Sequence, residues 1–152
     1  MFHKILVAID GSDASAHTLD VAAGLAITHE ALLIVAHALD ENLLPARHGG
    51  EPFGSRVDVQ RVWRAEGEAV LAAARKHLDR PHLRIETLLL ESDSLRADDQ
   101  IADAVTANGV DLVVIGSHGR RGIQRWVLGS VAERVARKVE CSVFVVRVRA
   151  PA

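Results

Sequence analysis

Apolar residues alternate along the chain between two patterns, one typical of strands and one of helices. Short continuous apolar runs, such as ILVAI at residues 5–9 and VVI at 113–115, are typical of strands that are buried on both faces. The pattern predicts strands over residues 4–9, 31–38, 83–90, 111–115 and 142–148. Apolar residues at helical spacing predict helices over residues 13–29, 57–78, 94–107 and 130–139.

Strict alternation of strand and helix predicts an α/β fold, a parallel sheet with helices on both faces, and one domain over residues 1–152. Arg84 and Glu86 alternate with apolar residues, which favours an edge position for the third strand. The first and fourth strands are the most apolar, so we expect them to be central. The fifth strand is apolar too, and at the other edge it would pair with a second copy. We therefore expect a homodimer through residues 142–148.

Composition narrows the class of protein. The chain has 152 residues, of which 49% are hydrophobic and only 3% aromatic, so its core must be aliphatic. A net charge of -2 argues against a nucleic-acid partner. A single cysteine, Cys141, excludes an intramolecular disulfide and a cysteine-rich zinc site. With no visible signal peptide and no apolar run approaching the ~20 residues of a membrane span, we expect a cytoplasmic protein.

A glycine-rich segment follows the fourth strand. It reads GSHG at residues 116–119, then nine residues, then GS at 129–130, where a helix is expected to begin. Glycine lets backbone N–H groups approach a ligand closely, and a helix N-terminus offers unpaired N–H groups with partial positive charge. The segment therefore predicts a phosphate site. Asp10 directly follows the first strand, and ligands of such sheets bind at these strand ends.

These segments resemble the universal stress protein family. The resemblance rests on VAIDGS at residues 7–12 and on the pattern G-x2-G-x9-G-[ST], and it covers essentially the whole chain. The glycine pattern is that of the family's ATP-binding branch. The resemblance implies a Rossmann-like, adenine nucleotide α-hydrolase-like sheet of strand order 3-2-1-4-5, and dimers that form through the fifth strand. Ser142 departs from the family, in which proline usually follows the position of Cys141.

The resemblance also implies which residues bind the base and the ribose. Asp10 matches an acidic residue beside the ribose and adenine. Ala38 aligns with a position whose backbone contacts the edge of the adenine. Gly116 and Gly119 match loop glycines near the ribose and phosphates. The implied ligand is ATP, with Mg²⁺ on its phosphates.

Further positions are implied on the phosphate side. Gly129 and Ser130 match the pair that holds the phosphates, and Val131 adds a backbone N–H group. Ser117 and His118 belong to the same loop, and their side chains could reach the ligand. No catalytic residue and no metal site of the chain's own is expected.

Several of these residues have a structural alternative. Asp10 could cap the helix that follows it. Ser130 and Glu133 have the spacing of a capping box, whether or not phosphate binds there. His118 could be a base or a metal ligand, but a loop histidine near phosphate is the safer interpretation. Three arginines of the loop could contact the γ-phosphate or merely be solvated: Arg120, Arg121 and Arg125.

The leading functional hypothesis is an ATP-binding regulatory dimer of the stress response. The alternatives are a slow ATPase or other nucleotide hydrolase on the same fold, and an interaction protein that binds no nucleotide. The segment 40–56 carries two prolines and three glycines without periodicity, which indicates a loop that could cover the nucleotide.

Overall fold

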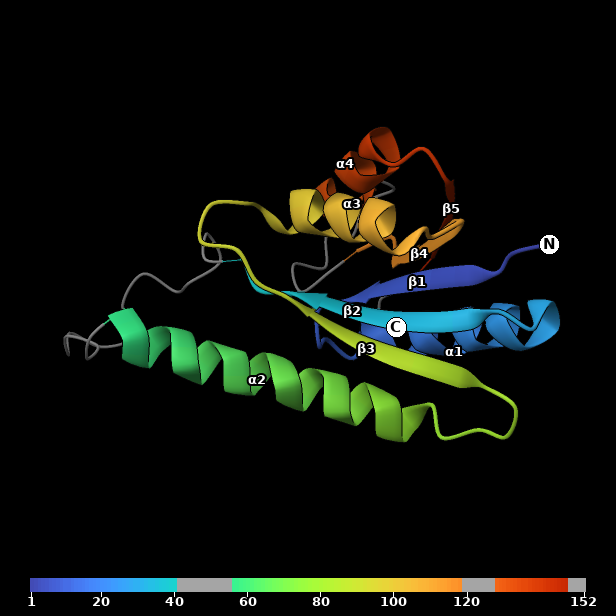
Figure 1. Ribbon diagram of the computed structural model, residues 1–152, viewed down its shortest axis with the longest axis horizontal. Coiled ribbons are helices and arrows are strands. Elements are labelled where there is room, and N and C mark those ends of the chain that lie inside the picture. The colour runs from blue at the N-terminus through green and yellow to red at the C-terminus, as the bar shows by residue number, and fades with distance from the viewer. Residues whose placement is uncertain (41–55, 119–127, 148–152) are drawn as a thin grey trace.

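The computed structural model describes residues 1–40, 56–118 and 128–147. Strands and helices alternate along the chain, as the apolar pattern predicts (Figure 1). All strand pairs are parallel, and the sheet order is β3-β2-β1-β4-β5, as the family resemblance implies. The strands are β1 (Lys4–Ile9), β2 (Leu32–Ala38), β3 (Arg84–Leu90), β4 (Leu112–Gly116) and β5 (Ser142–Val146). The helices are α1 (Ala14–His29), α2 (Arg56–His77), α3 (Ala97–Asn108) and α4 (Ser130–Lys138).

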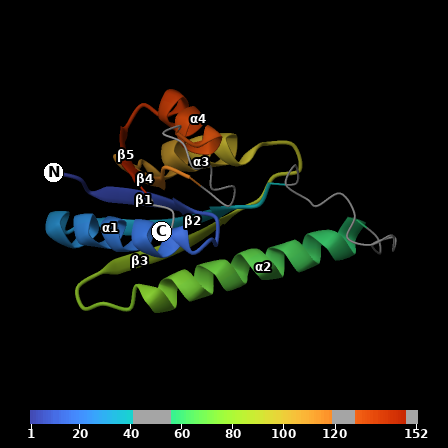
Figure 2. The ribbon, with the colours of Figure 1, turned by 180° about the vertical axis from the view of Figure 1, so that it is seen from behind.

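Helices cover both faces of the sheet, with α1 and α2 on one face and α3 and α4 on the other (Figures 1 and 2). Successive strand residues point to opposite faces of the sheet. β1 therefore contributes Ile5 and Val7 to the core under α1 and α2, and Leu6 to the core under α3 and α4. On the α3/α4 side, Ala104 and Val135 pack in the core with Leu6. This two-sided burial accounts for the continuous apolar runs of the central strands.

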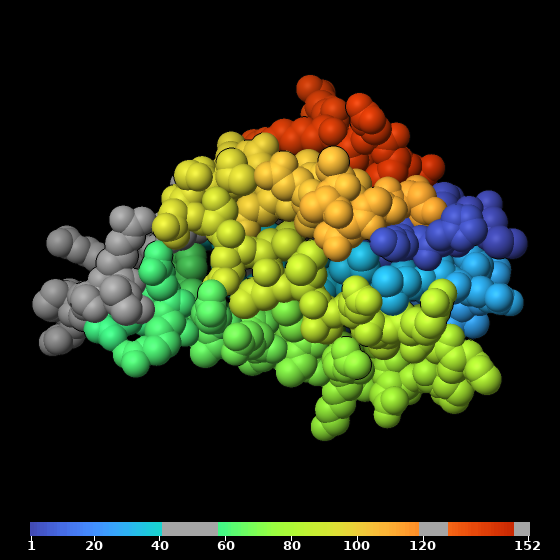
Figure 3. All heavy atoms as spheres, viewed as in Figure 1, coloured from blue at the N-terminus to red at the C-terminus, as the bar shows by residue number. Residues whose placement is uncertain are grey.

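The edge strands follow the charge pattern. Arg84 and Glu86 of β3 are exposed at one edge, which confirms the edge position expected for this strand. β5 lies at the other edge, and β1 and β4 lie inside the sheet. The space-filling view shows α2 along one side of the molecule, and α4 and β5 along the opposite side (Figure 3).

The helix expected over residues 94–107 begins three residues later, at Ala97. The hydroxyl oxygen of Ser92 accepts hydrogen bonds from the N–H groups of Ser94 and Leu95, at 3.3 and 3.0 Å. This local turn uses two N–H groups that the helix pattern alone would place in the first turn. The C-terminus is as expected, because Gly109 ends α3 with a left-handed φ of 60°.

Candidate functional site

Three of the expected ligand-binding residues lie together at the carboxyl ends of the inner strands. Asp10 directly follows β1, Ala38 is the last residue of β2, and Gly116 is the last residue of β4. β1 pairs with β2 in a register that ends at Ile9 and His37, and it pairs with β4 on its other side. The three positions therefore lie on neighbouring strands at their carboxyl ends, where parallel sheets bind ligands.

Asp10 organises the turn between β1 and α1. Its Oδ1 accepts hydrogen bonds from the N–H and hydroxyl groups of Ser12, at 3.0 and 2.6 Å, and from the hydroxyl of Ser15, at 3.0 Å. Gly11 permits the turn with a φ of 77°. The N-cap residue itself is Asp13, which makes no capping bond with its side chain. The capping role considered for Asp10 is therefore wrong: Asp13 is the N-cap, and Asp10 instead stabilises the turn before the helix.

The start of α4 is held against the end of β4. The N–H group of Gly129 donates a hydrogen bond of 2.7 Å to the carbonyl oxygen of Ser117, and the N–H group of Ser117 donates one of 2.7 Å to Val146. A Cβ at position 129 would lie only 2.9 Å from the same Ser117 oxygen. The φ of Gly129 is −58°, which any residue can adopt. Glycine is needed here because the two backbones approach closely.

The capping box expected at Ser130 and Glu133 is wrong. Gly129 is the N-cap residue, Ser130 is the first helical residue, and no side chain among the described residues caps the helix. The carboxylate of Glu133 instead pairs with Arg137 at 2.8 Å. The first intrahelical hydrogen bond runs from the N–H of Glu133 to the carbonyl oxygen of Gly129, so the N–H groups of Ser130 and Val131 precede it. These are the N–H groups that a helix N-terminus offers to an anion.

Ser117 and His118 form a contact of their own. Ser117 Oγ lies 3.0 Å from Nδ1 of His118, and Ser117 is only 7% exposed. Nε2 of His118 is buried and has no hydrogen-bond partner within the described ranges. Gly119, together with the segment 41–55, lies outside the described residues. The same holds for the loop arginines Arg120, Arg121 and Arg125.

Further polar contacts near the carboxyl ends of the strands join elements that are distant in the sequence. Nδ1 of the buried His37 lies 2.9 Å from the carbonyl oxygen of Ile9, which links the ends of β1 and β2. On α3, Asp98 and Gln100 are buried and make contacts with α4 and with the end of β2. Neither α3 residue was predicted from the sequence to have a role. A signal was available: two adjacent acidic residues in the first turn of α3, and two basic residues, Arg134 and Lys138, four positions apart on α4. Such a pattern indicates an ion pair between the two helices.

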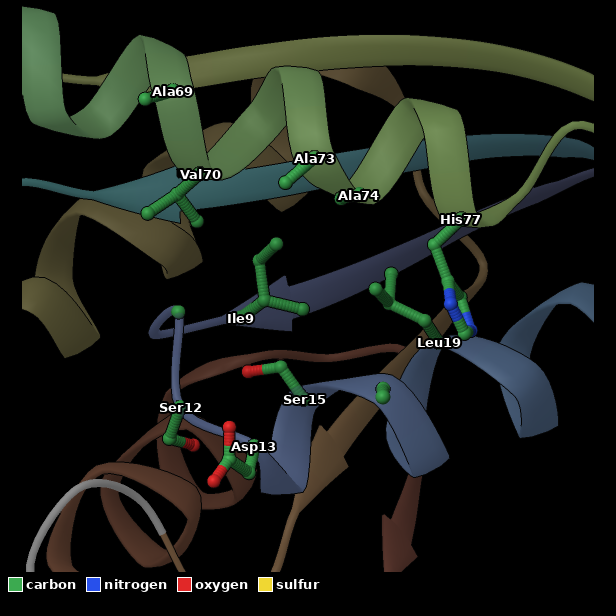
Figure 4. Close-up of a pocket in the computed structure, with 12 residues that line it drawn as sticks. Ile9, Ser12, Asp13, Ser15, Leu19, Ala69, Val70, Ala73, Ala74 and His77 are labelled. Carbon is green, nitrogen blue, oxygen red and sulfur yellow. The ribbon is translucent and has the colours of Figure 1, made fainter.

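A groove of about 460 Å³ lies between α1 and α2, on the face opposite α3 and α4. The side chains of Ile9, Leu19 and Val70 point into it (Figure 4). It shares the β1–α1 turn with the expected site but lies on the other face of the sheet from Gly129. The groove was not predicted from the sequence; the available signal was the set of small residues Ala69, Ala73 and Ala74 within the predicted helix.

The described residues contain no group of three or more histidine, cysteine or acidic side chains that could hold a metal ion. Nor do they contain a helix that is both long and apolar enough to span a membrane.

The family model described as "Universal stress protein family" matches residues 1–147. The chain belongs to the universal stress protein family. Universal stress protein YxiE of Bacillus subtilis is 31% identical over 153 residues, which cover 97% of this chain and 100% of the relative. The sequence motifs therefore identified the family correctly.

Solved structures of the family share the fold. A universal stress protein in complex with cAMP has a TM-score of 0.71 and 24% identity, and the match covers 97% of this chain and 98% of that one. The universal stress protein from Archaeoglobus fulgidus in complex with dAMP has a TM-score of 0.61 and 24% identity, covering 94% of this chain and 96% of that one. Each of these two proteins is therefore seen in complex with an adenine nucleotide.

Proposed function

We propose that this universal stress protein binds ATP at the carboxyl edge of β1, β2 and β4, and that it acts as a nucleotide-dependent regulatory homodimer in the cytoplasm. The observation that carries the proposal is the close approach of Gly129 to Ser117. It brings the N-terminus of α4, which no side chain of the described ranges caps, to the end of an inner strand. Family members that bind cAMP and dAMP support an adenine nucleotide as the ligand class.

The phosphates would lie at the start of α4. The N–H groups of Ser130 and Val131 precede the first intrahelical hydrogen bond there, and the missing Cβ of Gly129 lets the start of α4 approach the carbonyl oxygen of Ser117. Ser117 and His118 border the same place, since Gly129 is bonded to Ser117. The resemblance adds Gly119, which lies outside the described residues, as a further phosphate contact.

The base and ribose would lie between the ends of β1 and β2. Ala38 ends β2 and would offer its backbone to the adenine edge, and Asp10 would lie beside the ribose. Asp10 already uses Oδ1 to brace the β1–α1 turn. A ribose contact would therefore be made from a carboxylate whose orientation is already fixed.

Mg²⁺ would be held mainly by the phosphates. This ion keeps several waters and is commonly bound by substrate phosphates with one or two carboxylates. The described residues form no metal-ligand group of their own, which is compatible with this arrangement. The ion would neutralise phosphate charge when bound.

The homodimer would form through β5. Phe144 and Val145 are 44% and 38% exposed on this strand, which is an edge of the sheet. An apolar edge strand is a template for pairing with another copy. Nucleotide occupancy could reach this edge, because the N–H group of Ser117 is bonded to the β5 residue Val146.

The proposal is tested by releasing bound ligand. Purified protein is heat-denatured, and the supernatant is analysed by ion-exchange chromatography. Calorimetric titration of ligand-free protein with ATP, GTP and adenosine follows. We expect ATP to bind more tightly than GTP. Absence of ATP from the supernatant, together with no heat of binding at millimolar ATP, would contradict the proposal.

A slow ATPase remains the second candidate, and the Ser117–His118 contact favours it. The contact orients the imidazole through Nδ1. Nε2 is the ring nitrogen that has no hydrogen-bond partner within the described ranges. A ring oriented in this way beside a phosphate site could position a water. Single-turnover assays with labelled ATP on the native protein and on His118→Gln distinguish the two functions. Hydrolysis that is abolished by the substitution would favour the enzyme.

A further inference from the structure

The first turn of α3 is tied to the end of β2. Gln100 is 5% exposed, and its Nε2 donates hydrogen bonds to the carbonyl oxygens of Leu39 and Leu95, at 2.8 and 3.0 Å. Two carbonyl acceptors fix the amide with its nitrogen toward them. Oδ2 of Asp40 also accepts a hydrogen bond of 3.3 Å from the N–H group of Ala97. The residues directly after Ala38 are thus held by α3.

The same turn is tied to α4 by a buried carboxylate. Asp98 is 1% exposed, and its Oδ2 lies 2.5 Å from Nζ of Lys138. Its Oδ1 lies 3.4 Å from Arg96 and 3.8 Å from Arg134. A carboxylate buried this deeply is tolerated only when cations and hydrogen bonds compensate its charge. Hydrogen bonds to Asp98 and Asp99 raise the pKa of Lys138, as a charge-assisted contact should.

α4 therefore has two fixed points. Its N-terminus is bonded at Gly129 to the end of β4, and its last residue, Lys138, is bonded to α3. With a rise of about 1.5 Å per residue, Lys138 lies about 12 Å along the helix from Ser130. We expect so short a helix to move as a rigid body, so that loosening its C-terminal tie would tilt it about Gly129 and reorient the N–H groups of Ser130 and Val131.

We infer that the first turn of α3 is a positioning element that sets the spacing between the two halves of the nucleotide site, with Gln100 holding the base side and Asp98 the phosphate side. The inference rests on the proposed function. Neither residue is assigned a contact with the ligand. Gln100 acts through the backbone that follows Ala38, and Asp98 acts through α4.

Because Gln100 and Asp98 position different halves of the site, their substitution should cause two different binding defects. Asp98→Asn removes the buried one of the two carboxylates that hold Lys138. We expect about tenfold weaker binding of ATP with adenosine binding unchanged, because a small displacement of phosphate donors is costly. Gln100→Met keeps the length of the side chain but removes both donors. It should weaken ATP and adenosine by the same factor, about fivefold to tenfold, which is the scale of about one hydrogen bond.

The readout is the ratio of the dissociation constants of adenosine and ATP, measured by calorimetry below the unfolding temperature of each variant. Because each variant is folded at that temperature, a role in stability alone would leave both constants unchanged. Asp20→Asn is the matched control, because it removes an ion-pair carboxylate between α1 and α2, away from both halves of the site. Its ratio should equal that of the native protein.

Lys138→Gln tests the same tie from its exposed side, should Asp98→Asn not fold. A lowered ratio in Asp98→Asn or Lys138→Gln, together with equally weakened binding of both ligands by Gln100→Met, supports the inference. If the native protein binds ATP but the ratio is unchanged in both Asp98→Asn and Lys138→Gln, the inference fails and the proposed function stands. If the native protein binds no ATP, both are overturned.

Discussion

The N–H group of Gly129 donates a 2.7 Å hydrogen bond to the carbonyl oxygen of Ser117, and a Cβ on Gly129 would lie 2.9 Å from that same oxygen. A contact this short between a Cβ and a backbone oxygen cannot be relieved by rotating a side chain. One backbone segment would have to move. The contact thus makes the geometry of the α4 N-terminus depend on the absence of a side chain at one position.

Gly129→Ala should weaken ATP binding by about tenfold or more, because the added methyl group moves α4 away from the end of β4. We expect a smaller effect on the fold, because the core residues of α4 are unchanged. Calorimetric titration gives the affinity, and thermal unfolding gives the stability. An unchanged affinity would remove this contact from the binding site.

Gly24→Ala is the matched control for that substitution. Gly24 lies within α1, and a Cβ there would meet nothing within 4 Å. Alanine should stabilise the helix by roughly 0.5–1 kcal/mol and leave ATP affinity unchanged. Weaker binding in both glycine variants would point to a general effect rather than to the contact with Ser117.

Phe144→Glu should convert the proposed dimer to a monomer. The side chain is 44% exposed on the edge strand, so a charge is tolerated in the isolated chain but not between two apolar edges. Light scattering after size-exclusion chromatography measures the mass. Glu86→Gln, on the opposite edge strand β3, is the control and should leave the mass unchanged. A monomeric native protein would contradict the dimer itself.

The stability that Asp20 provides should depend on pH. Partial burial raises the pKa of this carboxyl, but hydrogen bonds from His77 and Arg80 outweigh it and hold the pKa below its ordinary value of 3.8. A lowered pKa in the folded state stabilises the protein above the ordinary value, and this contribution is lost as the pH falls through the folded-state pKa. The difference in unfolding free energy between the native protein and Asp20→Asn should therefore shrink below about pH 4.

Urea denaturation at a series of pH values from neutral to acidic measures that difference. Asp103→Asn is the control, because Asp103 is exposed on α3 and forms no ion pair within the described ranges. Identical pH profiles for the two variants would show that the cluster of Asp20, His77 and Arg80 does not link α1 to α2.

Cys141 should react slowly with thiol reagents. Burial raises the pKa of its thiol above the ordinary value of 9.0, and the charge of Asp111 raises it further. Because the thiolate is the reactive form, we expect labelling by Ellman's reagent at pH 8 to be about tenfold slower in the folded protein than in urea. Equal rates in the two conditions would contradict this, and the unfolded chain serves as the internal control.

The apolar pattern predicted every strand and helix that the structure describes, and the charges on β3 predicted one edge of the sheet. The glycine spacing identified the family and directed attention to Gly129. These features could be predicted because periodicity and turn chemistry are local properties of the chain. Even so, two local details differ from the prediction. The hydrogen bonds of Ser92 place the start of α3 at Ala97, and the N-cap of α4 is Gly129 where the spacing of Ser130 and Glu133 predicts Ser130.

The sequence by itself determined the alternation of strands and helices, their burial on two faces and the position of the glycine-rich segment. Only the tertiary structure decided which side chains meet: Asp98 with Lys138, forty residues apart, and Gln100 with the backbone of Leu39, sixty-one residues apart. Such partners depend on the order of the strands and on the rotation of each helix over the sheet. These are set by the packing of the whole core, and no local stretch of sequence carries that information.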